Sequence, residues 1–414
     1  MIDDSIHQWL EAAYPLGFKL HTAAEAYEIF ARKTIAEAFP SWRVELRVIL
    51  LESPGRFSCA APEKDLIVLD NRQIRLFTIQ DWLFRQPDVP EAASLTLAAL
   101  TLAAAMRGHF NLTDRTFLCT QMWRERAEAL RDLTRTALAH KGHSALSAFL
   151  LLHEAAHIAL EQSEPFTQSI VERVTGALRA HRSTNVDLLE RLKSGQIYDD
   201  PRVTVEGDPD RLIADLEAHI RFIDSSGEEI VRESSCDVLA AKGFLNWRSG
   251  GDFLNTKPSP NALTPQDIGD LIVLCLRCSR LLAVQSATAE MANHLATSED
   301  RPEIGDAFSQ MQARSNVVID VLRQLFDEAL THCGIDGSNL AGETSNLNRD
   351  IENLAHRTAE YLLSPVEHLA SYFEQNELYI KDFEKSTKAA FADHKPSLVE
   401  LLMSVDKINR EFLI

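Results

Sequence analysis

The chain has 414 residues, of which 45% are hydrophobic and 25% charged, as is typical of a folded globular protein. Its formal net charge of −19 disfavours nucleic acid or an anionic membrane as a partner, because both would repel it. The first residues lack the basic and apolar segments of a secretory signal, and no apolar stretch approaches the about 20 residues that cross a bilayer. We therefore expect a cytoplasmic protein with reduced cysteines.

The N-terminal part of the chain changes from a helical to an extended pattern. Apolar positions at helical spacing predict two helices within residues 1–40. Residues 42–50 then largely alternate apolar and charged side chains, which is typical of a half-buried strand. Two further short strands are expected at 57–61 and 66–69, after a Ser-Pro-Gly turn. These segments predict a small antiparallel β-sheet near the N-terminus.

From residue 73 onward the pattern is almost entirely helical. Thr264 followed by Pro265 is a helix start signal. Loops rich in Gly, Pro, Ser and Asn are expected at 249–263 and 334–346. The fold class is therefore mainly α with a small antiparallel β-sheet (α+β). The expected helices are 74–87, 91–108, 113–138, 144–162, 167–195, 208–222, 225–248, 266–296, 303–333, 347–374 and 379–412.

Two cysteines form a CxxC pattern, Cys275 and Cys278. They lie inside the apolar run LIVLCLRCSRLLAV, and thiols three residues apart on a buried helix face are far more often core than redox centres. We expect both side chains to be part of the hydrophobic core.

The segment HEAAH at residues 153–157 matches the pattern HExxH. On a helix, His153 and His157 share one face and can both present an imidazole to one ion. Glu154 lies about 100° round the same turn, so it can reach a water on that ion without binding the ion itself. Zinc held by two His and one carboxylate keeps a coordination position open and lowers the pKa of its water to about 7. Glu154 would take the proton of that water and pass it to the leaving amine.

A catalytic site of this kind needs a third protein ligand. The extended metzincin pattern would place Gly at 160 and His at 163, but the chain has Leu160 and Ser163 there. Downstream, Glu233 and Asp237 are four residues apart on a predicted helix. Glu233 can ligate the zinc, and Asp237 can accept the outer N–H of a ligand His and fix its orientation.

Other residues compete for the place of the third ligand. Glu217, His219 and Glu228 precede Glu233 in the same region, but none has an acidic partner four residues on. We expect these three to be solvated surface. Glu229 shares a helix face with Glu233 and is its nearest substitute.

An HExxH motif followed by a helix with ExxxD resembles the gluzincin arrangement. The order of motifs is similar to that of the phage-exclusion Lit-type peptidases, which share features with membrane-bound heat-shock and prenyl-protein metalloproteases. Those families have a third motif, close to THPxxxxRI, and MANHLATSEDRPEIGDAF at 291–308 occupies the corresponding place. The resemblance implies that His294 stabilises the oxyanion and that Arg301 orients the acidic ligand region. Asn293 and Leu295 depart from the motif, so a plain helix-end histidine is the alternative for His294.

The resemblance covers about residues 40–310, and the Gly- and Ser-rich stretch near 335–345 is the expected boundary between two domains. Residues 1–335 would form a zincin-like metallopeptidase domain with an N-terminal α/β cap, and 336–414 a C-terminal helical region of unknown role. The implied function is that of a cytoplasmic zinc metalloendopeptidase that cleaves a protein or peptide, regulated by a trigger, in phage defence or a stress response.

Two other functions remain open on the sequence alone. The chain could be a non-proteolytic helical sensor or regulatory protein with a structural or degenerate zinc site, or a zinc hydrolase acting on a non-peptide amide. A working enzyme keeps one coordination position open beside Glu154, whereas a structural zinc site is closed by four protein ligands.

Overall fold

A computed structural model describes residues 4–14, 18–53, 58–85, 143–196, 208–249, 264–297, 304–332 and 345–353. Within these ranges the chain is mainly helical with a small four-stranded sheet near the N-terminus, which confirms the α+β class. The helices expected at 91–108, 113–138 and 379–412, most of the one at 347–374 and the domain boundary near 335 lie outside the described residues.

The sheet is formed by four short strands in the order β1-β2-β4-β3. The outer pairings are antiparallel, but β2 and β4 run parallel, with Arg47 opposite Leu66, so the expectation of a wholly antiparallel sheet was wrong for this pair. After β2 the chain forms β3 at the far edge of the sheet. A 3₁₀ turn then reverses its direction, so that β4 lies between β2 and β3 and runs parallel to β2. The strands are β1 (Lys19–Leu20), β2 (Arg47–Glu52), β3 (Cys59–Ala61) and β4 (Leu66–Asp70).

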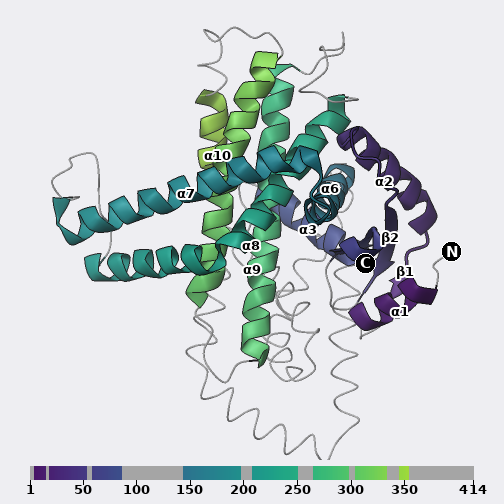
Figure 1. Cartoon of the computed structure of the whole chain (residues 1–414), viewed down its shortest axis with the longest axis horizontal. Coiled ribbons are helices and arrows are strands. Elements are labelled where there is room, and N and C mark those ends of the chain that lie inside the picture. Colours follow the sequence, from purple (N-terminus) through teal and green to yellow (C-terminus); the bar gives the residue numbers. More distant parts are fainter. Residues whose placement is uncertain are drawn as a thin grey trace, which may run out of the picture.

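The two central strands are buried on both faces, as is common for parallel strands. One face packs against helix α1 (Asp4–Ala13), and its strand residues are Ile49, Leu51, Leu66 and Val68. The other face belongs to the main core with α2 (Ala24–Ala38), through Val48, Leu50, Ile67 and Leu69. Figure 1 shows the sheet, α1 and α2 gathered at one end of the long axis of the molecule.

The helical body consists of six long helices among the described residues. One of them, α8, is continuous, although the sequence predicts a break at residues 223–224. Helix α7 supports α8 at this point: Arg182 forms a two-bond ion pair with Asp224, and Leu178 packs against Gly227. The helices are α3 (Asn71–Arg85), α6 (His143–Glu161), α7 (Pro165–Lys193), α8 (Pro209–Ser249), α9 (Pro265–Thr297) and α10 (Ile304–His332).

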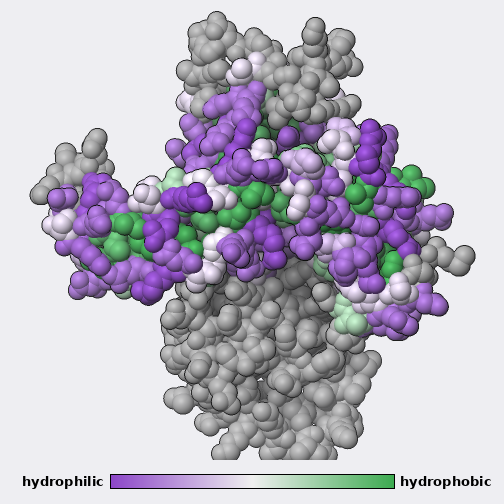
Figure 2. Space-filling view, in the orientation of Figure 1, coloured by the Kyte–Doolittle hydropathy of each residue, from purple (hydrophilic) through white to green (hydrophobic). Residues whose placement is uncertain are grey.

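Helix α7 and the first part of α8 form an arm that projects from the body (Figure 1). Lys193 and Glu217 form an ion pair across the arm, 2.5 Å from Nζ to Oε1. Hydrophilic side chains cover most of the described surface on the face seen in Figure 2, in keeping with the charged composition.

Helix α6, which carries HEAAH, lies in the centre of the core. Its apolar side chains on both sides of the motif are buried, namely Leu150, Leu151, Leu152, Ala155, Ala156, Ile158 and Ala159. Such a helix is held by packing on all sides, so its polar residues must find partners inside the protein.

Two expectations for helix α9 are confirmed. Thr264 and Asp267 form reciprocal hydrogen bonds at its first turn, 3.1 Å from the Asp267 backbone N to Thr264 Oγ1 and 2.9 Å from the Thr264 backbone N to Asp267 Oδ2. Cys275 and Cys278 are buried as free thiols. No helix in the described ranges has an apolar stretch of the length that a membrane span requires.

Candidate metal centre

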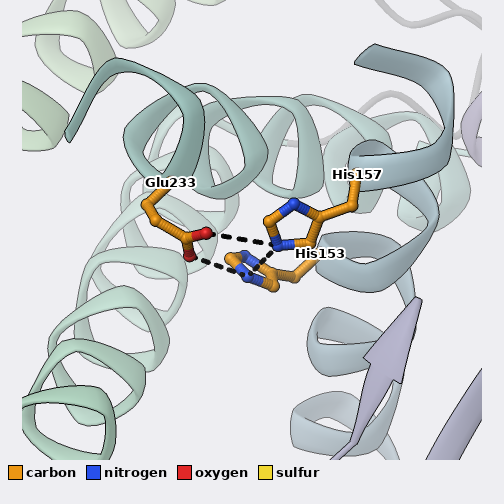
Figure 3. Close-up of side chains that lie close together, drawn as sticks. All are labelled: His153, His157 and Glu233. Carbon is orange, nitrogen blue, oxygen red and sulfur yellow. Dashed lines mark hydrogen bonds and ion pairs between the residues drawn. The ribbon is translucent and has the colours of Figure 1, made fainter. Parts of the chain in front are cut away.

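Helices α6 and α8 bring His153, His157 and Glu233 together, as Figure 3 shows. The two imidazole Nε2 atoms are 3.2 Å apart. Glu233 Oε2 lies 3.7 Å from Nε2 of His153, and Glu233 Oε1 lies 3.6 Å from Nε2 of His157. The two motifs therefore lie together in space, although His157 and Glu233 are 76 positions apart in the chain (233 − 157).

These separations fit a single zinc ion. For ligand atoms at about 2.0–2.1 Å from the metal, the 3.2 Å between the two Nε2 atoms corresponds to an angle of roughly 100° at the metal, and Glu233 would supply one of its two oxygens. Among the described residues, three protein donors would leave one tetrahedral position without a protein ligand. That is the coordination pattern of a catalytic rather than a structural zinc site.

The outer nitrogen of each imidazole faces a residue of α8. His153 Nδ1 lies 3.0 Å from Asp237 Oδ1, and His157 Nδ1 lies 3.2 Å from Cys236 Sγ. Asp237 thus lies where the sequence places it, beside a candidate ligand His. The sequence did not predict the contact with Cys236, because its place next to Asp237 in the chain does not indicate that its side chain meets His157.

Arg314 on α10 neutralises the acidic residues of the centre. It contacts Asp237 through two hydrogen bonds, and its Nη1 lies 3.3 Å from Glu233 Oε2. Ser279 on α9 donates a further hydrogen bond to Asp237 Oδ2, at 2.7 Å. Burial alone would raise the pKa of Asp237, but Arg314 and the hydrogen bond with His153 hold it well below its ordinary value.

The sequence resemblance gave the role of this arginine to Arg301, which lies outside the described residues. A signal for Arg314 was nevertheless present. It shares a helix face with three apolar residues at helical spacing, and a charged residue within such a stripe must be buried and paired. The three residues are Val317, Val318 and Val321, all buried.

Glu154 is buried next to the two imidazoles of the candidate centre and is not among the three converging side chains. Burial raises the pKa of Glu154 to about 7, against the opposing effects of His153 and of a hydrogen bond from the backbone of Ala60 on β3. A carboxyl group with a pKa near neutral can both accept and return a proton at that pH.

The remaining candidates do not join the centre. Glu217 pairs with Lys193, Glu229 lies near Arg232, and Glu228 is exposed. His219 is buried and contacts His181 instead, so the expectation that it lies on the surface was wrong. His294 lies inside α9, and its side chain is outside the described part of the structure.

Comparisons of the whole chain with descriptions of protein families, with curated proteins and with solved structures gave no match. The resemblance to the Lit-type peptidases therefore rests on the motifs alone.

Proposed function

We propose that the chain is a cytoplasmic zinc-dependent endopeptidase that hydrolyses a peptide bond with a metal-activated water. The convergence of His153, His157 and Glu233 on one point, with Glu154 beside them, carries the proposal. Zinc, when bound, would polarise the scissile carbonyl and lower the pKa of a coordinated water.

The residues of the chain have separate tasks in this proposal. His153 and His157 hold the ion as neutral imidazoles, and burial lowers the pKa of His157 to about 4, which favours that form. Glu154 accepts the proton of the attacking water and delivers it to the leaving amine. Asp237 orients His153, and Arg314 offsets the charge of Asp237 and Glu233.

The position of strand β3 supports an extended peptide as the substrate. It is the last strand of the sheet among the described residues, and the backbone of its residue Ala60 contacts Glu154. An extended peptide can add to the edge of a sheet as a further strand, and here it would meet the edge at the point where Glu154 binds the Ala60 backbone. A substrate bound in this way would have its backbone held beside the general base.

The motif resemblance to the Lit-type peptidases adds a regulated role in phage defence or a stress response to the proposal. The alternative, a non-proteolytic sensor with a structural or degenerate zinc site, differs in one measurable respect. A structural site binds zinc without supporting hydrolysis, whatever occupies position 154.

The test compares the wild-type chain with Glu154→Gln. Both proteins are loaded with zinc, their metal content is measured, and new peptide N-termini are counted by mass spectrometry after incubation with a cell lysate. Glu154→Gln should bind as much zinc as wild type and generate no new N-termini. Glu161→Gln, at the exposed end of the same helix, serves as the control and should cleave like wild type. Equal cleavage by Glu154→Gln and wild type would remove Glu154 as general base, and a zinc-loaded wild type without cleavage would favour the sensor.

A further inference from the structure

A second pair of histidines has the geometry of the pair in the metal centre. His181 on α7 and His219 on α8 bring their Nε2 atoms to 3.2 Å, with ring centroids 5.5 Å apart and an interplanar angle of 81°. The values for His153 and His157 are 3.2 Å, 4.9 Å and 84°. For ligand nitrogens at about 2.0–2.1 Å from an ion, a separation of this size corresponds to an angle of about 100° at the metal.

A third donor lies at the same point. The side-chain amide of Asn185, one turn after His181 on α7, is 3.1 Å from His181 Nε2. The oxygen and nitrogen of an amide exchange places by a flip of the side chain, so Asn185 can present its oxygen there. Oxygen and imidazole nitrogen are both ligands that zinc and its neighbouring divalent metals accept.

Hydrogen bonding alone satisfies this cluster poorly. A neutral imidazole carries either one lone pair or one N–H at Nε2, yet His181 Nε2 faces both His219 and Asn185. His219 is only 5% exposed, so solvent can supply few of the missing hydrogen bonds. One cation would accept the lone pairs of all three side chains at once.

We propose that His181, His219 and Asn185 form a second site for a divalent transition-metal ion such as Zn²⁺. An ion there would link α7 to α8 within the arm. His219 and Glu233 are 14 residues apart on α8 (233 − 219), which is about 21 Å along the helix. The second ion would therefore bind independently of the candidate catalytic centre.

The experiment counts zinc ions by calorimetric titration of the full-length, metal-stripped chain. Wild type should bind two Zn²⁺ ions per chain, whereas His181→Ala and His219→Ala should each bind one. The double variant His153→Ala/His157→Ala should also bind one ion, at the second site. Adding His219→Ala to this double variant should abolish that binding as well. His7→Ala, which removes an exposed histidine, is the matched control and should retain two.

The outcomes separate this site from the proposed peptidase. The second site would be overturned if His181→Ala and His219→Ala each still bound two ions. It would also be overturned if wild type bound a single ion that only His153→Ala/His157→Ala removed. Either result would show that the contact between His181 and His219 is an ordinary hydrogen bond between imidazoles. The reverse result is also possible: wild type binds a single ion, and His219→Ala removes that ion whereas His153→Ala/His157→Ala does not. This result would support the second site and contradict the candidate metal centre. His181 is only partly buried, so its variant gives a result even if His219→Ala does not fold.

Discussion

Arg314 holds both carboxylate oxygens of Asp237, with Nε 2.7 Å from Oδ2 and Nη2 2.9 Å from Oδ1. The two side chains are 2% and 0% exposed. Since Asp237 also faces Nδ1 of His153, helix α10 fixes the orientation of a candidate metal ligand on α6 through a residue of α8. The charge of the centre and the packing of three helices therefore depend on one guanidinium group.

Arg314→Met should lower the free energy of unfolding of the metal-free protein by about 3–5 kcal/mol, the typical cost of leaving one partner of a buried ion pair without the other. Asp237 and Glu233 would both lose their buried counter-charge. Urea denaturation followed by circular dichroism measures the effect.

Arg173→Met is the matched control for that substitution. Arg173 pairs with Glu328 at 2.6 Å, but the two side chains are 35% and 45% exposed, so the loss should be at most about 1 kcal/mol. Adding Asp237→Asn to Arg314→Met should recover part of the stability, because the unpaired carboxylate is then gone. Similar losses for the two arginine variants would show that burial does not strengthen the Arg314 pair.

Glu233→Ala should weaken zinc binding at the candidate metal centre by more than about 100-fold, since even residues that only contact a ligand contribute 10–100-fold. The titration uses protein that also carries His219→Ala, so that one site is observed, and a chromophoric chelator as competitor. Glu229→Ala, one turn earlier on the same helix and exposed, should bind zinc with wild-type affinity. Equal affinity of the two alanine variants would exclude Glu233 as a ligand.

The sequence predicted which side chains lie together in the candidate centre because their spacing depends on local helix geometry. HEAAH and the ExxxD pair each put two side chains on one face, and long apolar helices can bring those faces together. Arg314 lies 77 residues from Asp237 in the chain, and only the packing of α10 against α8 makes that contact.

The parallel pairing of β2 and β4 was missed for a similar reason, since strand direction follows from the path of the chain and not from alternation. Helix α8 continues through Asp224 and Gly227, where it contacts α7. Local helix propensity does not include such contacts between helices, so the sequence predicted a break there.

Glu154→Gln should change how the stability of the metal-free protein varies with pH. Burial raises the pKa of Glu154 from 4.5 to about 7. Below pH 4.5 the carboxyl is protonated in both the folded and the unfolded chain. Between pH 4.5 and 7 it ionises only in the unfolded chain, so wild-type stability falls as the pH rises. A shift of this size corresponds to at most about 3 kcal/mol.

Because glutamine does not titrate, the stability of Glu154→Gln relative to wild type should rise between pH 4.5 and 7 and remain constant above that window. Urea denaturation at half-unit steps from pH 4 to 8 gives this difference. Glu161→Gln, on the same helix but exposed, should show no such rise. A flat difference for Glu154→Gln would mean that its carboxyl group is solvated in the folded protein.

Two glycines of α8 should respond to alanine in opposite directions. At Gly243, an added Cβ would lie 3.0 Å from Phe39 Cζ and 3.1 Å from Ala38 Cβ. Phe39 cannot move aside easily, because its ring stacks on Phe166 with centroids 5.4 Å apart. At Gly227 the nearest atom is Leu178 Cδ2 at 3.8 Å, an ordinary contact.

Gly243→Ala should therefore destabilise the protein by up to about 2 kcal/mol, since the crowding costs about 1–3 kcal/mol and alanine returns about 1 kcal/mol of helix propensity. Gly227→Ala should stabilise it by about 0.5–1 kcal/mol, as only the propensity gain applies. Urea denaturation of both variants under identical conditions decides the matter. Stabilisation by both substitutions would show that α2 and α8 can separate without loss, and destabilisation by both would mean that the arm is more tightly packed at Gly227 than the 3.8 Å contact indicates.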